Sequence, residues 1–167
     1  MRQFIKRMFV IFPFEEEFYK KQGIPVTFAG HPVVEKDFKL SERSEFFKLH
    51  GFDESKPLVA LLPGSRRNEM ERHTQPLLDT IALLSQEQPD IQFVLAGLSS
   101  LSDSYYDPFS QLESVKIVGD NPYPMMAHAD VAIVASGTAT LETAYLGTPL
   151  VVIYKIAPVS YLIGKLL

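Results

Sequence analysis

The sequence contains no cysteine, which excludes disulfide bonds and thiolate metal sites and is typical of a protein from a reducing compartment. We therefore expect a cytoplasmic location. It also has fewer basic than acidic residues: the 16 Lys and Arg and the 20 Asp and Glu give a net charge of -4. These basic residues are scattered. Since affinity for a nucleic-acid backbone comes from clustered Lys and Arg, we expect no nucleic-acid partner.

Long hydrophobic runs are scarce at both ends of the chain. Residues 1–7 are rich in charge and no long apolar core follows them, so they do not resemble a signal peptide. Residues 149–154 and 158–167 are apolar, but Lys155, Pro158 and Lys165 interrupt the run, which is too broken for a membrane span of about 20 residues. We expect the opening of a core helix at 158–167, and the alternative is a helix lying in a membrane interface.

The length and apolar content fit one domain, or one domain with part of another. The 167 residues are 46% hydrophobic, which is enough for a sizeable core. Short apolar runs alternate with helical patterns, and this rhythm predicts an α/β fold, a Rossmann-like doubly wound parallel sheet. Strands are expected at 9–12, 26–29, 58–62, 91–96, 115–118, 131–134 and 150–153, with helices at 15–21 and 41–50 and a polar, hinge-like connection at 33–40.

The longest helical pattern follows the strand at 58–62. Its apolar positions fall on one face, as expected for a helix that covers a sheet; they are Met70, Leu77, Leu78, Ile81 and Leu84. Pro76 lies inside this pattern and is expected to split or kink the helix. Thr74 is a candidate N-cap for the second part.

Two strands run into small polar turns that precede helices. Ser65 and Arg66 follow the strand at 58–62, and Ser136, Gly137 and Thr138 follow the strand at 131–134. Such turns lie at the carboxyl edge of a parallel sheet, where N–H groups at helix N-termini favour phosphate oxygens. Two of them on one sheet predict a diphosphate held between them.

The sequence also restricts the nucleotide. It has neither the G-x-G-x-x-G phrase of dinucleotide-binding folds nor the G-x-x-x-x-G-K-[ST] phosphate loop, which disfavours NAD and ATP. Glu142 lies four residues after Thr138, about one helical turn further on. There its carboxylate can accept hydrogen bonds from ribose hydroxyls. The alternative is that Ser136 caps the helix and Glu142 is a solvated acid in its first turns.

Four phrases in fixed order resemble the lipid-A-disaccharide synthase family. The resemblance covers nearly the whole chain and is carried by residues 12–19, 28–32, 62–66 together with Glu69, and 135–142. It implies an inverting glycosyltransferase of the GT-B type, with two facing Rossmann-like domains. Such an enzyme joins a UDP-2,3-diacylglucosamine donor to a 2,3-diacylglucosamine 1-phosphate acceptor, giving the lipid A disaccharide and UDP. It further implies a peripheral position at the inner membrane of a Gram-negative-type bacterium.

The resemblance also divides the chain. Residues 1–32 would be the tail of the N-terminal acceptor domain, and residues 33–167 most of the UDP-sugar donor domain. Family members are roughly twice as long. The catalytic base and most of the acceptor pocket would precede this chain, and the last donor-domain elements would follow it. We therefore expect the 167 residues alone to form no disaccharide.

Family membership would give Arg66 the catalytic role of stabilising the diphosphate as it leaves. Ser65, the turn at 136–138 and Glu142 would bind the rest of UDP. The alternative is a surface arginine paired with Glu69 or Asn68. No D-x-D pair is present, and an arginine with helix dipoles can replace a divalent cation, so we expect neither a metal nor another cofactor.

Two further residues, His31 and Lys155, keep two interpretations each, and His128 has one. His31 either lines the interdomain cleft or stabilises its own turn. Lys155 is either a phosphate contact or a solvated strand end. His128 is expected to pack before a strand.

Two rival functions use the same features. A UDP-N-acetylglucosamine 2-epimerase-like enzyme shares the two-domain architecture and a Ser-Gly turn with a ribose-binding Glu. The phrases at 28–32 and 63–66 favour the lipid enzyme over it. The other rival is a non-catalytic UDP-binding module.

Overall fold

The computed structural model describes residues 4–119 and 121–155, and it separates into two compact units. One unit ends at Asp37 and the other begins at Phe38, so each is described by itself. Within the described residues, no helix is long and apolar enough to cross a membrane. The expected helix opening at 158–167 lies outside the described residues.

The first unit is a small β-α-β arrangement. Strands β1 (Met8–Val10) and β2 (Val26–Phe28) pair in parallel, and α1 (Pro13–Lys21) connects them. Pro13 opens α1, where its fixed φ suits the first turn, and the Glu15 carboxylate accepts the Phe12 N–H at 3.0 Å. The short 3-10 helix η1 (Pro32–Glu35) follows β2 and occupies part of the stretch expected to be a polar connection.

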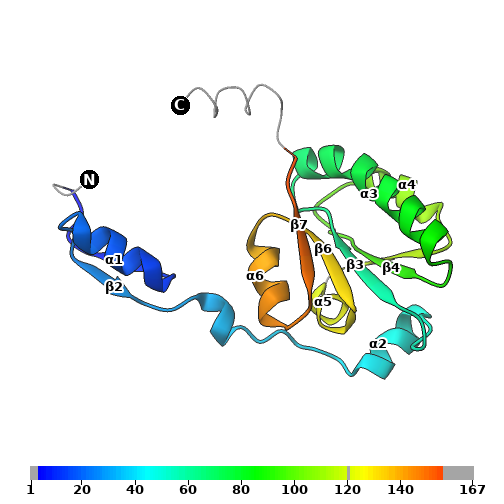
Figure 1. The fold of residues 1–167 in the computed structure, drawn as a ribbon, viewed down its shortest axis with the longest axis horizontal. Coiled ribbons are helices and arrows are strands. Elements are labelled where there is room, and N and C mark those ends of the chain that lie inside the picture. The colour runs from blue at the N-terminus through cyan, green and yellow to red at the C-terminus, as the bar shows by residue number, and fades with distance from the viewer. Residues whose placement is uncertain (1–3, 120, 156–167) are drawn as a thin grey trace. The chain divides into compact units, whose positions relative to one another are not determined.

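The second unit is built on a five-stranded sheet whose neighbouring strands are all parallel, in the order β5-β4-β3-β6-β7. Figure 1 shows β3 near its centre. The strands are β3 (Leu58–Leu62), β4 (Gln92–Ala96), β5 (Val115–Val118), β6 (Val131–Ala135) and β7 (Leu150–Ile153). The doubly wound parallel sheet predicted from the sequence is confirmed.

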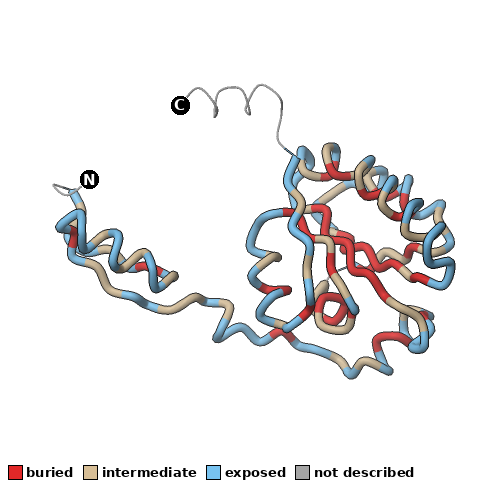
Figure 2. Tube along the Cα trace, in the orientation of Figure 1, coloured by how far each residue is buried: buried red, intermediate tan, exposed pale blue. Residues whose placement is uncertain are grey.

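Helices cover both faces of this sheet and create two cores. The helices are α2 (Arg43–His50), α3 (Arg67–Glu87), α4 (Asp107–Ser110), α5 (Tyr123–His128) and α6 (Thr138–Tyr145), with a 3-10 turn η2 (Asp103–Tyr105) before α4. Side chains of a strand alternate between faces, so Ala60 of β3 packs in a core with α2 and α5, whereas Leu61 packs in a core with α3 and α4. Figure 2 shows the resulting buried band along the central strands.

Helix α3 differs from its prediction. It runs unbroken from Arg67 to Glu87 with Pro76 inside it, so the expected split is wrong. Thr74 is not an N-cap, because its hydroxyl donates to the Met70 carbonyl, one turn earlier, at 2.7 Å. Met70, Leu77 and Ile81 are buried against the sheet, and this packing outweighs the cost of the proline.

The other element boundaries agree closely with the sequence. Each predicted strand, and each of the helices predicted at 15–21 and 41–50, has a counterpart whose ends lie within two residues of the expected ones. The short helices α4 and α5 were not predicted. Both are only a turn or two long, so they show little of the periodicity on which a prediction depends.

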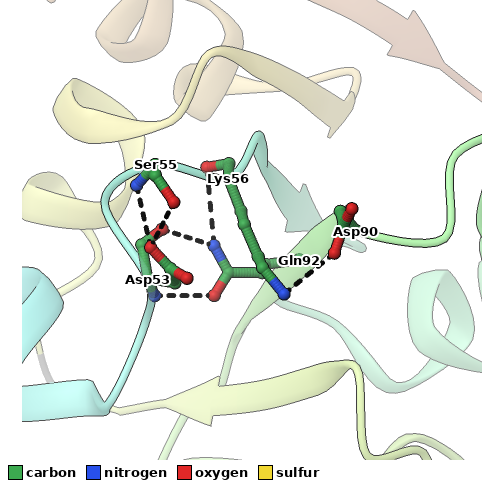
Figure 3. A network of polar contacts seen from close by, with 5 residues as sticks. All are labelled: Asp53, Ser55, Lys56, Asp90 and Gln92. Atoms are coloured by element: carbon green, nitrogen blue, oxygen red, sulfur yellow. Dashed lines mark hydrogen bonds and ion pairs between the residues drawn. The ribbon is translucent and has the colours of Figure 1, made fainter.

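A polar network anchors the loop that leads into β3 (Figure 3). Gln92, the first residue of β4, accepts the Asp53 N–H and donates to the Asp53 carbonyl, both at 2.8 Å. Asp53 also accepts bonds from Ser55, and Lys56 pairs with Asp90 at 2.9 Å. The network lies at the amino ends of the strands and fixes the sheet from the edge opposite the polar turns.

Candidate nucleotide site

The order of the strands creates a crevice at the carboxyl edge of the sheet. From β3 the chain builds outward through β4 and β5, and then crosses to β6 and β7 on the other side. Strands β3 and β6 are paired neighbours, with Leu62 opposite Val134. In open α/β sheets, ligands bind where the strand order reverses in this way.

A cavity of about 320 Å³ lies at this position, within the size range of small-molecule sites. Both polar turns line it. So does every residue that the sequence predicted to bind UDP, namely Ser65, Arg66, Ser136, Gly137, Thr138 and Glu142. The fold therefore brings together two segments that are about 70 residues apart in the sequence.

The second turn presents a helix N-terminus to the cavity. Helix α6 begins at Thr138 with Gly137 as N-cap, and no side chain caps it. The alternative in which Ser136 caps the helix is therefore wrong; the backbone N–H of Ser136 donates instead to Ile153 of β7 at 2.9 Å. The first N–H groups of a helix have no partner within it and carry the positive end of its dipole, so this turn suits an anion.

Glu142 lies one turn into α6, where it lines the same cavity. Its residue surface is 8% exposed, so the alternative of a solvated acid is wrong. The Tyr123 hydroxyl donates to its Oε1 atom at 3.3 Å. A buried carboxylate needs hydrogen-bonding partners, and its place in a cavity gives Glu142 access to a polar ligand.

Aromatic packing fixes Tyr123. Its ring meets Phe38 edge to face at 5.0 Å between centroids, and Phe38 stacks on Tyr145 at 5.8 Å. Phe38 is buried although it belongs to the stretch that the sequence predicted to be a polar connection. Tyr123 is thereby held where it contacts Glu142.

The first turn differs from its expectation. The N–H groups of Ser65 and Arg66 are not open to a ligand, because both donate to Oε2 of Glu69, at 2.9 and 3.2 Å. Glu69 also accepts a bond from the Arg66 guanidinium at 2.8 Å. Arg66 therefore pairs with Glu69, as the alternative interpretation expected, and it also lines the cavity.

These contacts perturb Glu69. Partial burial alone would raise the pKa of its carboxyl, but the hydrogen bonds from the Arg66 guanidinium and from the N–H groups of Ser65 and Arg66 outweigh it and lower the pKa. Hydrogen bonds to the ionised form favour that form. Glu69 is therefore a stable anion within the turn.

Gly64 makes room for this arrangement. It has a φ of +112°, in the region that glycine adopts without strain. A Cβ atom there would lie 2.4 Å from Oε2 of Glu69. Any larger residue would displace the carboxylate from the turn.

His73, one helical turn after Glu69, joins the turn after β3 to the segment that follows β7. Its side chain is buried, its Nδ1 lies 2.7 Å from the Pro63 carbonyl, and its Nε2 accepts the Lys155 N–H at 3.1 Å. Because a carbonyl only accepts, Nδ1 carries the proton and Nε2 does not. The imidazole links the turn after β3 to the segment that follows β7.

We predict that His73→Leu lowers the free energy of unfolding by about 1 to 2 kcal/mol, because two hydrogen bonds are lost while the side-chain volume is nearly kept. Urea denaturation of the chain measures this loss. Gln86→Leu on the exposed face of α3 is the control for placing a leucine in this helix. Equal stability of the two variants would show that the His73 bonds contribute nothing.

The remaining sequence candidates have local roles in the structure. His31 is the N-cap of η1, where its Nδ1 accepts the Val33 N–H at 3.1 Å; that it lines a cleft stays a prediction. His128 packs as expected, with Nε2 2.7 Å from the Ser41 carbonyl. Lys155 has an exposed residue surface and uses its backbone in the bond to His73. Across residues 4–119 and 121–155, no group of three or more acidic or His side chains is placed to hold a metal ion.

Sequence reasoning missed two residues of this site, His73 and Tyr123, and it named Glu69 only as an alternative partner of Arg66. Glu69 had a detectable signal, because a Glu three residues after a helix N-cap is one half of a capping box. His73 could have been suspected from its position one turn further along the same helix. Tyr123 had no signal, since it contacts Glu142 from a helix too short to be recognised.

The chain is similar to a known protein family over all of its residues. The family model for lipid-A-disaccharide synthetase matches residues 1–167. A lipid-A-disaccharide synthase of Solibacter usitatus is 41% identical over 167 residues, which are 100% of this chain and 44% of that protein. The synthases of Geobacter metallireducens and Coxiella burnetii are 40% and 36% identical over 163 and 165 residues, covering 96% and 99% of this chain and 42% and 44% of theirs. The chain thus spans less than half the length of these relatives.

A solved structure supports the fold. The crystal structure titled GtfA/B complex superposes with a TM-score of 0.56 and 12% identity, covering 91% of this chain and 31% of that chain. At this identity the similarity concerns the fold alone.

Proposed function

Because this chain belongs to the lipid-A-disaccharide synthase family, we propose that it forms the donor half of a glycosyltransferase that acts in lipid A biosynthesis. Residues 33–167 bind the UDP-sugar, and residues 1–32 end the acceptor domain. The observation that carries this proposal is the cavity at the switch point, which both polar turns and Glu142 line together. A protein that carries this chain together with the rest of the family's length is called the complete enzyme below.

In the proposed reaction, a hydroxyl of 2,3-diacylglucosamine 1-phosphate attacks the anomeric carbon of UDP-2,3-diacylglucosamine. The bond from that carbon to the diphosphate breaks, and the bonding electrons leave with UDP. The hydroxyl proton passes to a base outside the residues of this chain. Inversion follows from attack on the face opposite the leaving group, and lipid A disaccharide is formed.

The two turns have separate tasks in this reaction. Negative charge grows on the diphosphate as it leaves, so groups aimed at its oxygens lower the barrier. Arg66 supplies a full positive charge from one side, and the N-terminus of α6 supplies N–H groups from the other. Glu142 accepts hydrogen bonds from the ribose hydroxyls, and these bonds fix the position of the nucleotide relative to Arg66 and the N-terminus of α6.

The proposed substrates are acylated, so the complete enzyme works at the cytoplasmic surface of the inner membrane as a peripheral protein. Lipid chains stay in the bilayer while the sugar headgroups reach the crevice.

Titration of the 167-residue chain with UDP, NAD and ATP, followed by calorimetry, tests the nucleotide assignment. We expect binding of UDP and markedly weaker binding of the other two. A preference for NAD or ATP would contradict the proposal. An assay of the complete enzyme with both acylated substrates separates the rivals: disaccharide identifies the transferase, 2-epimerised UDP-sugar the epimerase-like enzyme, and UDP binding without turnover the non-catalytic module.

A further inference from the structure

Glu69 occupies the place where an anion would bind at the first turn. One of its oxygens accepts the two backbone N–H groups of Ser65 and Arg66, and the other accepts the Arg66 guanidinium. The Glu69 side chain is 18% exposed, whereas that of Arg66 is 79% exposed. The carboxylate is therefore the inner member of the pair and the guanidinium the outer one.

Two roles are compatible with a carboxylate in this place. It either competes with the diphosphate and must leave when the nucleotide binds, or it stays and holds Arg66. Three features of the turn favour the second role. Gly64 has no Cβ atom, which would lie 2.4 Å from Oε2 of Glu69, so the turn is shaped to admit the Glu69 carboxylate. His73 holds the turn in place through its hydrogen bond to the Pro63 carbonyl. The three bonds to one carboxylate are also charge-assisted and stronger than neutral ones.

We propose that Glu69 is a positioning residue that stays in the turn when the UDP-sugar binds and aims the Arg66 guanidinium at the diphosphate. The proposal rests on the function proposed above. A guanidinium has five N–H donors, and the bond to Glu69 uses one N–H of its Nη1 atom. The outer donors of the same group are directed to the ligand. The diphosphate thus meets the Arg66 side chain and the α6 N-terminus, and not the backbone N–H groups of Ser65 and Arg66.

Two substitutions separate the contacts of Glu69. In Glu69→Gln, the amide oxygen still accepts the two backbone N–H groups, but the amide NH₂ faces the guanidinium, donor against donor, and releases Arg66. In Glu69→Ala, both contacts are lost. Glu71→Gln is the matched control, because Glu71 lies on the same helix but outside the cavity. Its carboxylate accepts a hydrogen bond from the Tyr105 hydroxyl.

Amide hydrogen exchange of the 167-residue chain, followed by NMR, measures the contact with the turn without any ligand. In Glu69→Ala, exchange at Ser65 and Arg66 is expected to rise by about tenfold, the loss of one hydrogen bond to a charged group. In Glu69→Gln and Glu71→Gln it stays near that of the natural chain. Unchanged exchange in Glu69→Ala would overturn the proposal, and it would do so whether or not the chain binds UDP.

Kinetics of the complete enzyme measure the positioning of Arg66. Glu69→Gln is expected to lower kcat by about tenfold with little change in KM, because the misdirected charge is needed most in the transition state. In an Arg66→Ala background, Glu69→Gln should have no further effect, since Glu69 acts through Arg66.

One binding result and one kinetic result would overturn the proposal. Tighter UDP binding by Glu69→Gln would show that the carboxylate competes with the ligand. An undiminished effect of Glu69→Gln in the Arg66→Ala background would show that it acts independently of Arg66. Failure of the natural chain to bind UDP would instead contradict the proposed function and leave the exchange result to decide on the turn.

Discussion

Arg66→Ala is expected to lower kcat of the complete enzyme by about ten- to hundredfold, with a much smaller change in KM. A charge-assisted hydrogen bond contributes about 1.5 to 3 kcal/mol, which corresponds to that range of rates. The charge of Arg66 is needed most when the diphosphate leaves, so its loss affects the transition state more than the bound substrate. Steady-state kinetics with the acylated donor and acceptor measure both constants.

The neighbouring arginine provides the control for this prediction. Arg67 is exposed, lies outside the cavity and approaches the Tyr105 ring at 5.9 Å, so Arg67→Ala should leave kcat nearly unchanged. Arg66→Lys keeps the charge but not the planar group that pairs with Glu69, and we expect an intermediate kcat. Turnover of Arg66→Ala close to that of the natural enzyme would remove Arg66 from the site.

The pairing of Arg66 with Glu69 sharpens this expectation. The Arg66 guanidinium is paired with the Glu69 carboxylate 2.8 Å away, which is expected to reduce its attraction for a resting diphosphate. As the diphosphate leaves, its growing negative charge is expected to strengthen its attraction to the Arg66 guanidinium. A paired arginine of this kind is suited to discriminate the transition state from the ground state.

The central strand β3 could be predicted from the sequence because burial on both faces leaves a continuous apolar run. All five residues of β3 are buried, and such continuous apolar runs are typical of parallel sheets. Pro76 misled the prediction because a local rule was applied to a helix whose stability is not local. The apolar face of α3 packs along the sheet and compensates for one missing hydrogen bond.

The site was predictable to the extent that it depends on short segments. The two turns follow directly from strands, and topology alone places them at one edge of the sheet. Contacts between distant residues were not predictable: Tyr123 meets Glu142 across 19 positions, and His73 meets Lys155 across 82. The contact of Glu69 with the first turn could be predicted only in part. Its capping signal was present in the sequence, but the same signal also fits a helix with no ligand nearby.

Glu142→Gln is expected to weaken binding of UDP by about ten- to hundredfold while hardly changing the affinity for 2′,3′-dideoxy-UDP. A carboxylate accepts bonds from two ribose hydroxyls, and charged hydrogen bonds of about 1.5 to 3 kcal/mol account for the loss. Because Glu142 is buried, little water competes for those bonds. Calorimetric titration of each variant with each ligand gives the four affinities of a double-mutant-type cycle, which isolates the pairing of carboxylate and ribose.

Two further variants decide how Glu142 acts. Tyr123→Phe removes the hydroxyl that donates to Oε1 at 3.3 Å, so it should weaken UDP by less than Glu142→Gln and again spare the dideoxy ligand. Glu71→Gln, outside the cavity, should change neither affinity. Equal weakening of UDP and dideoxy-UDP by Glu142→Gln would show that Glu142 supports the fold of α6 rather than the ribose, because a change in the fold affects both ligands alike.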